Sequence, residues 1–189
     1  MKKRNIIQYN SPVILTFAGV SLVVLILGAI TGGATNKLLF SVYRSSLASP
    51  LTYIRLFTHV LGHKDLSHYI SNMMFFLLLG PAIEEKYGSR DTLIMIALTA
   101  LITGLINFIL FPSSALLGAS GVVFCFIVLS SMTGVKEGKI PLTLIIVCIL
   151  YIGQEVINAI FVNDNVSQLT HIVGGACGCG FGYAAGKKK

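Results

Sequence analysis

Long apolar runs separated by glycine, proline and asparagine dominate the chain. Apolar runs of membrane-spanning length lie at residues 12–31, 67–83, 92–111, 119–134, 141–161 and 168–186. Because the bilayer interior offers no hydrogen-bonding partner to the backbone, such runs predict helices rather than isolated strands. The pattern predicts an all-α membrane protein, a six-transmembrane-helix bundle in which the other helices surround the short, glycine-bearing fourth and sixth.

The remaining segments are short, which predicts a single membrane domain at residues 12–186. A short N-terminal segment, residues 1–11, precedes this domain, and a basic tail, residues 187–189, follows it. The longest connection, residues 32–66, contains apolar and aromatic residues, so we expect it to lie partly in the membrane interface. No internal repeat is visible in the sequence.

Composition agrees with a membrane protein. Apolar residues make up 54% of the chain and charged residues 11%, and the mean hydropathy is +0.83. Soluble domains carry roughly twice that charged share, about 25%. The four cysteines lie in apolar stretches without a CxxC motif, and we interpret them as small buried hydrophobic residues rather than metal or redox sites. They are Cys125, Cys148, Cys177 and Cys179.

The basic residues predict the orientation of the bundle. The net charge is +7, but no basic stripe interleaved with aromatic residues is present, so we expect no nucleic-acid binding. With both termini in the cytoplasm, inner segments hold Lys2, Lys3, Arg4, Lys86, Arg90, Lys136, Lys139, Lys187, Lys188 and Lys189, and outer segments hold Lys37, Arg44, Arg55 and Lys64. This asymmetry follows the positive-inside rule and predicts a multi-pass cell-membrane protein with cytoplasmic termini. The short basic ends fit a prokaryotic plasma membrane.

Four polar residues that are far apart in the sequence fall at one depth of the predicted bundle. His68 and Asn72 lie in the first turns of the second predicted helix, Ser120 opens the fourth, and His171 lies in the first turn of the sixth. These three helices cross the membrane in the same direction, so the four side chains share a layer below the outer surface. Such groups inside a membrane are costly and usually functional, which predicts a catalytic or binding site here.

The residue types in this layer suit acyl-transfer chemistry. A serine hydroxyl becomes a nucleophile when a nearby imidazole accepts its proton. His68 and Asn72 are four residues apart and project from one helix face, and with the backbone N–H of Ser120 they can donate hydrogen bonds to an oxyanion. The competing interpretations are a helix-capping serine and histidines that are interior hydrogen-bonded groups or proton relays.

Glycines accompany the candidate serine and the candidate histidine. The segment Gly118–Gly121 allows the backbone to approach a substrate and turn sharply into a helix, but Val122 distinguishes it from the G-x-S-x-G motif of α/β-hydrolases. Glycines also repeat at every fourth position of the last helix, at Gly174, Gly178, Gly182 and Gly186. We expect this stripe to press the sixth helix closely against the fourth.

A set of motifs follows a specific order from about residue 50 to residue 186. In chain order, the motif residues are Arg55, His59, His63, His68, Asn72, Glu84, Gly88, Gly118, Ala119, Ser120, Gly121, His171, Gly174 and Gly178. This set resembles the rhomboid family of intramembrane serine proteases. The resemblance covers nearly the whole predicted membrane domain.

The resemblance implies a serine endopeptidase with a Ser–His dyad, in which Ser120 is the nucleophile and His171 the base. It implies that His68, Asn72 and the Ser120 backbone N–H stabilise the oxyanion. It also implies membrane-spanning protein substrates, often single-pass, that are cleaved near the outer face, without a cofactor or metal. The residues assigned by resemblance to the active-site loop and its packing are Gly118, Gly121, Phe124, Gly174 and Gly178. Arg55 and Glu84 would be structural.

The sequence departs from the family pattern at two positions. Ile54 stands where a tryptophan often precedes the arginine, and Phe124 stands where the family often has an aromatic hydroxyl beneath the catalytic histidine. We expect activity to survive both changes.

Three questions stay open at this stage. Glu155, in the predicted fifth helix, is either an interior hydrogen-bonded or cavity-facing group or an influence on a lateral gate for substrate. The chain could instead be a binding protein of the same fold, although Ser120 and His171 are both retained. A small transporter or proton channel is the other rival, which the absence of an internal repeat disfavours.

Overall fold

A computed structural model describes residues 9–132, 142–143, 145–146, 149–150 and 165–186 of the 189-residue chain. The predicted fifth helix, residues 141–161, lies outside the described residues apart from the few positions between 142 and 150. Glu155 and both predicted terminal segments, apart from residues 9–11, also lie outside the described residues, so the hypotheses that concern them stay predictions.

The described part of the chain is helical. Its elements are α1 (Pro12–Ile30), α2 (Ala34–Leu39), α3 (Pro50–Thr58), the 3-10 turn η1 (His59–Leu61), α4 (Leu66–Tyr87), α5 (Ser89–Leu110), α6 (Ser120–Ser131) and α8 (Asn165–Gly186). Among the described helices, α1, α4 and α5 are long and apolar enough to cross a membrane, and α6 is a shorter apolar helix. The all-α membrane fold is confirmed in these terms, and the count of six spans stays a prediction.

Several helix boundaries differ from the predicted ones, and the end of α4 and the start of α8 matter most for the motif residues. The second predicted span ends at residue 83, just before the charged Glu84, but α4 continues to Tyr87 and is capped by Gly88, whose φ is +83°. A helix end follows backbone geometry rather than hydrophobicity, and glycine adopts this positive φ without strain. The helix α8 begins at Asn165 rather than at residue 168. His171 therefore lies in its second turn, and the predicted first-turn position is wrong.

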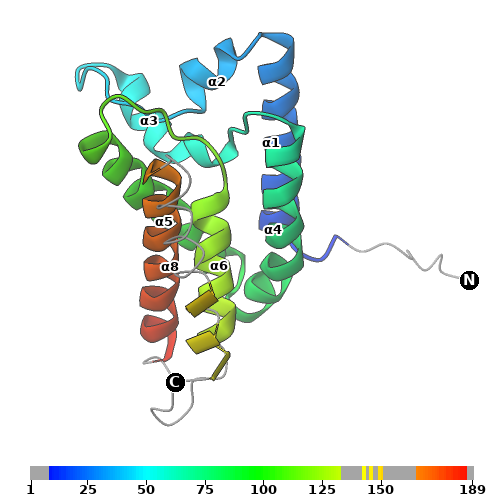
Figure 1. Cartoon of the computed structure of the whole chain (residues 1–189). Coiled ribbons are helices and arrows are strands. Elements are labelled where there is room, and N and C mark those ends of the chain that lie inside the picture. Colours follow the sequence, from blue (N-terminus) through cyan, green and yellow to red (C-terminus); the bar gives the residue numbers. More distant parts are fainter. Residues whose placement is uncertain (1–8, 133–141, 144, 147–148, 151–164, 187–189) are drawn as a thin grey trace, which may run out of the picture.

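The connection between α1 and α4 contains more regular structure than the sequence pattern predicts. It forms α2, α3 and η1, which lie at one end of the bundle (Figure 1). Tyr53, Ile54 and Phe57 of α3 are exposed, which is compatible with the interfacial location that we expect for this segment.

The helix α6 forms the centre of the described bundle. Its Val122, Cys125, Phe126 and Leu129 are fully buried, and it packs against α4, α5 and α8. Figure 1 shows α8 running alongside α6, and this is the most extensive contact between any two described helices. The prediction that neighbouring helices enclose the fourth helix agrees with this arrangement.

Glu84 joins α4 to the start of α1. Its two carboxylate oxygens accept hydrogen bonds from the backbone N–H groups of Val13 and Ile14, each at 3.1 Å. The hydroxyl of Ser89 donates a further bond at 2.6 Å. The first N–H groups of a helix have no partner within the helix, and the helix dipole favours a negative charge beside them. The buried carboxylate is therefore a structural group that fixes two helices together.

Candidate active site

Ser120 is the first residue of α6. Ala119 occupies the N-cap position, and no side-chain hydrogen bond caps this end of the helix. Gly118, just before it, has a φ of +132°, a conformation that favours glycine. Since Ser120 does not cap α6, the helix-capping interpretation loses its support. A sharp turn at Gly118 thus leads directly into the candidate nucleophile.

Backbone bonds hold the loop before Ser120 at two points. The N–H of Gly118 donates to the carbonyl of His59 at 3.0 Å. Val42 and Leu116 form an isolated antiparallel bridge, with both N–H···O distances at 2.9 Å. The loop is therefore anchored to η1 and to the segment between α2 and α3.

Asn107 is a buried polar residue of α5 that sequence reasoning missed. Its side-chain amide donates to the carbonyl of Val42 at 3.0 Å and to that of Ser114 at 3.3 Å. It thus ties α5 to both sides of the Val42–Leu116 bridge. The available signal was an asparagine near the end of the third apolar run, where a buried amide requires partners.

His68 lies against the turn that precedes Ser120. A Cβ atom placed on Gly118 would come within 2.8 Å of Cε1 and 2.9 Å of Nε2 of His68. The backbone at this position can therefore approach the imidazole only because residue 118 has no side chain. The carboxylate of Asp65 accepts a bond from the His68 N–H at 2.8 Å and caps α4, which fixes the backbone of His68.

Asn72 lies one turn after His68 and is buried in α4. Its side-chain amide donates to the backbone carbonyl of His68 at 2.8 Å. The NH₂ group of an asparagine carries two hydrogens that point in different directions, so one amide hydrogen does not take part in this bond. Asn72 can therefore hold this internal bond and still offer a donor to a bound group.

His171 of α8 packs against α6, on the face of α6 that carries Ser120 and Phe124. Its ring stacks on Phe124 with centroids 4.2 Å apart and planes within 5° of parallel. Residues four apart on a helix share a face, so Phe124 lies one turn below Ser120 on the same side of α6. His171 is also close enough to His68 for the two imidazoles to interact electrostatically.

Glycines determine how closely α8 approaches α6. A Cβ on Gly174 would overlap the backbone carbonyl of Gly121, and one on Gly178 would overlap that of Cys125. Gly121 faces Thr170 in return, since its own Cβ would lie 3.3 Å from the Thr170 Cγ2. The predicted glycine stripe is the contact face of α8 over these turns, and this contact brings His171 to Phe124. At Gly186, an added Cβ would have none of the described residues within 4 Å.

Three further motif residues, Arg55, His59 and His63, are buried. Arg55 donates to the Tyr43 hydroxyl at 2.7 Å and to the Ser45 hydroxyl at 2.9 Å, and its guanidinium lies over the Tyr43 ring. The Nε2 atom of His59 lies 3.0 Å from the carbonyl of Ala100. Burial lowers the pKa of His59 to about 4. Burial and then the neighbouring charge of His68 lower the pKa of His63 to about 4. Both imidazoles are therefore neutral at pH 7.

The described residues contain no group of three or more histidine, cysteine, aspartate or glutamate side chains placed to bind a metal ion. Close to the start of α6 lie the imidazoles of His68 from α4 and of His171 from α8, and Ser120 is the first residue of α6. Of the residues singled out from the sequence, the structure brings His68, Gly118, Ser120, Gly121, Phe124, His171 and Gly174 into one region.

Comparisons with known proteins identify the family of the chain. A family model described as "Rhomboid domain" matches residues 50–188. The chain is 29% identical over 177 residues to "Rhomboid protease GluP" from Bacillus subtilis (strain 168), which covers 89% of this chain and 34% of that protein. It is 28% identical to YdcA from the same strain over 133 residues, covering 66% of this chain and 62% of that protein.

A third similarity is shorter. The chain is 29% identical over 83 residues to "Rhomboid protease GlpG" from Enterobacter sp. (strain 638), covering 44% of this chain and 30% of that protein. The chain thus spans less than two thirds of the length of each of these three relatives. The family match covers most of the chain and includes every element of the candidate site. This chain is therefore a helical membrane protein that belongs to the rhomboid family.

Proposed function

We propose that the chain is an intramembrane serine endopeptidase that cleaves membrane-spanning proteins with a Ser120–His171 dyad. The observation that carries the proposal is the stacking of His171 on Phe124, one turn below Ser120 on the same face of α6. Membership of a family whose named relatives are rhomboid proteases supports this chemistry. Family membership implies membrane-protein substrates in general, and we propose that they are often single-pass.

The proposed reaction begins with proton transfer. His171 accepts the proton of the Ser120 hydroxyl, and the oxygen attacks the scissile carbonyl. Negative charge then develops on the carbonyl oxygen, where preorganised donors stabilise it most effectively. The backbone N–H of Ser120, the free amide hydrogen of Asn72 and the imidazole of His68 would supply these donors. His171 returns the proton to the leaving amine, and water then hydrolyses the acyl-enzyme.

The close contact between α6 and α8 would preorganise the dyad. A displacement of about 1 Å in a catalytic group can cost about 10²-fold in rate. Gly174 and Gly178 let the two backbones touch, so His171 is positioned by rigid helices rather than by a loop. Gly118 in turn lets His68 approach the turn before Ser120.

We also propose the finer topology predicted by the sequence. Residues 12–186 would form one membrane domain of six spans between residues 1–11 and 187–189, with both termini in the cytoplasm. Cleavage would then occur near the outer face of a bacterial cell membrane. The positive-inside distribution of lysine and arginine supports this orientation.

Labelling by a fluorophosphonate probe tests the dyad directly. The detergent-purified protein should be labelled, and Ser120→Ala and His171→Ala should each lose the label, because the probe reacts with activated serines. Ser131→Ala is the matched control at the other end of α6 and should label like the wild type. Melting temperatures of all four proteins show whether the fold is retained.

The possible outcomes separate the competing functions. Persistent labelling of Ser120→Ala would refute Ser120 as the nucleophile. If the folded wild type stays unlabelled while an active rhomboid protease labels beside it, the chain is better described as a binding protein of this fold.

A further inference from the structure

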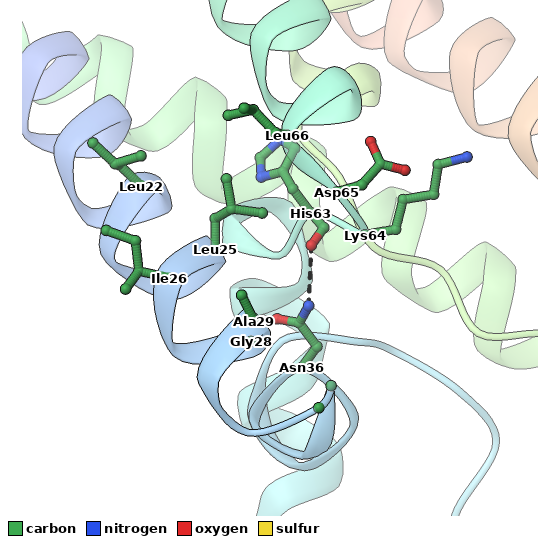
Figure 2. Close-up of a pocket in the computed structure, with 12 residues that line it drawn as sticks. Leu22, Leu25, Ile26, Gly28, Ala29, Asn36, His63, Lys64, Asp65 and Leu66 are labelled. Carbon is green, nitrogen blue, oxygen red and sulfur yellow. Dashed lines mark hydrogen bonds between the residues drawn. The ribbon is translucent and has the colours of Figure 1, made fainter.

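A pocket whose lining does not include Ser120 lies between the C-terminal half of α1, the start of α2 and the segment that enters α4. Its volume is about 640 Å³, and Figure 2 shows the residues that line it. One wall is apolar and consists of α1 side chains, chiefly Leu22, Leu25 and Ile26. The opposite wall is polar and includes Asn36, His63 and Lys64. Walls of such different chemistry suit an amphiphilic ligand.

The apolar wall is continuous with the membrane-facing side of α1. Ile26 lines the pocket and is 49% exposed, and Ile30, one turn further on, is 76% exposed. Since α1 is apolar enough to cross a membrane, these exposed side chains face acyl chains rather than water. A hydrocarbon chain can therefore enter the pocket from the bilayer.

The polar wall contains two buried acceptor atoms that lack partners. Asn36 is 9% exposed and donates its amide N–H to the His63 carbonyl at 3.0 Å (Figure 2), but its Oδ1 has no hydrogen-bond partner among the described residues. His63 is fully buried, and its Nε2 also lacks a partner within the described part of the chain. Unsatisfied buried polar atoms are rare and costly.

The His63 tautomer makes its Nε2 atom an acceptor. The Nδ1 atom lies 3.2 Å from the carbonyl of Leu61, and a carbonyl can only accept, so the proton lies on Nδ1. Both free atoms therefore require a donor, such as an amine or a hydroxyl. The exposed Lys64 at the rim adds a cation, which attracts a phosphate.

We propose that this pocket binds one phospholipid of the surrounding bilayer whose headgroup carries hydrogen-bond donors, as ethanolamine and glycerol headgroups do. An acyl chain would lie along Leu22 and Ile26 of α1, the phosphate at Lys64, and the headgroup donors at Asn36 Oδ1 and His63 Nε2. This lipid site does not depend on the proposed proteolytic activity. It is nevertheless adjacent to the candidate active site, because the His63 and His68 rings meet edge to face with centroids 5.1 Å apart.

Native mass spectrometry of the full-length protein, with lipids added to the detergent, tests the proposal. The probes are phosphatidylethanolamine, phosphatidylglycerol and phosphatidylcholine with identical acyl chains. The first two should bind about two- to tenfold more tightly than phosphatidylcholine, because its quaternary ammonium cannot donate the hydrogen bond that Asn36 and His63 require.

Two substitutions locate the site. Ala29→Trp fills the pocket from the α1 side and should remove one bound lipid, whereas Val20→Trp on exposed α1 surface outside the pocket should not. Lys64→Gln should weaken binding of all three lipids, since each carries a phosphate, whereas Lys37→Gln on α2 should have no effect. The Lys64 side chain is exposed, so its removal tests the site even if Ala29→Trp fails to fold.

The proposal fails if Lys64→Gln weakens binding no more than Lys37→Gln, or if a folded Ala29→Trp protein retains every lipid. Equal affinity for phosphatidylcholine would overturn the assignment of Asn36 and His63 as headgroup acceptors. Loss of Ser120 labelling, by contrast, would leave all these lipid measurements unchanged.

Discussion

Two helix interfaces of this molecule are built in opposite ways. Between α6 and α8, glycines bring backbone against backbone, with Gly174 facing Gly121 and Gly178 facing Cys125. Between α1 and α4, side chains make the contact. Phe17 and Phe76 lie with ring centroids 4.6 Å apart, and the Glu84 carboxylate caps the start of α1.

This difference suggests that the α6–α8 contact positions His171, whereas the α1–α4 contact mainly stabilises the fold. A backbone contact cannot relax by rotamer changes, so any added atom must displace α8 and with it His171. A side-chain contact can repack, and its loss costs stability while the distant site keeps its geometry. We therefore expect substitutions at α6, α8 and the facing part of α4 to change the rate, and substitutions between α1 and α4 to change mainly the melting temperature.

Asn72→Ala should produce the largest loss of rate with an intact fold. Removing one oxyanion donor typically costs about 10²–10³-fold in kcat. Cleavage of a fluorescent transmembrane substrate in proteoliposomes measures this loss, and Ser71→Ala on the exposed side of α4 is the control. A rate within about threefold of the wild type would show that Asn72 is not an oxyanion donor. The loss of even one neutral hydrogen bond is expected to lower the rate by about that factor.

Gly174→Ala should reduce both rate and stability. Its methyl group would overlap the Gly121 carbonyl, so α8 must shift, and we expect a rate loss of about 10²-fold and a destabilisation of about 1–3 kcal/mol. Gly180→Ala is the matched control, because no described residue lies within 4 Å of its added Cβ. If the two variants behave alike, the close contact does not position His171.

Acidification should destabilise the folded protein through His59 and His63, which lie between α3 and α4. The pKa of His59 and of His63 is about 4 in the folded protein and about 6.5 in an unfolded chain. The unfolded state therefore binds more protons below pH 6.5, and stability falls as the pH is lowered towards 4, by about 1.4 kcal/mol per pH unit for each histidine.

Melting temperatures in detergent between pH 7.5 and 4.5, at constant ionic strength, measure this loss. His63→Gln removes one of the two titrating groups, so the slope of its melting temperature against pH should be shallower than that of the wild type. A melting temperature independent of pH would contradict burial of the neutral imidazoles.

Glu84→Gln should lower stability by about 1–3 kcal/mol, because the charge-assisted bonds to the start of α1 weaken and an amide hydrogen replaces one acceptor. The rate per folded molecule should change little. Glu85→Gln, at the exposed neighbouring position, is the control for the loss of charge. A rate loss without a fall in melting temperature would reverse the roles that we assign to the two interfaces.

Phe124→Tyr should have the smallest effect. The ring that stacks on His171 is retained, and the added hydroxyl can donate only one hydrogen bond, which is worth about two- to tenfold in rate. The same substrate assay measures it. Phe124→Leu, which removes the stacked ring, should reduce the rate further, and an equal effect of the two substitutions would indicate that stacking is unimportant.

The long helices were predicted well from the sequence, because a helix that crosses a bilayer needs a long run of apolar residues. The first predicted span, residues 12–31, differs from α1 by one residue at its end. Apolar runs do not reveal where a helix continues through charged residues, as α4 does from Glu84 to Lys86. The short helices α2 and α3 were not predicted, because six and nine residues give too little periodicity.

The candidate site was predicted only in part, because the sequence pattern locates helix starts but not contacts to backbone atoms. Residues at helix starts, such as His68 and Ser120, could be assigned to a layer from topology alone. The anchors of the loop before Ser120 could not, because Gly118 bonds to the backbone carbonyl of His59 and Asn107 bonds to that of Val42. Every residue has such a carbonyl, so no residue type marks these partners.

The glycine-lined contact between α6 and α8 also sets an order of assembly. A protein is synthesised from its N-terminus, so α8 (Asn165–Gly186) is the last of the described helices to be made. Until α8 docks on α6, Ser120 lies at the end of its helix without the imidazole that our mechanism requires. A growing chain that lacks α8 is therefore inert towards its membrane neighbours, and the proposed activity begins only once α8 has docked on α6.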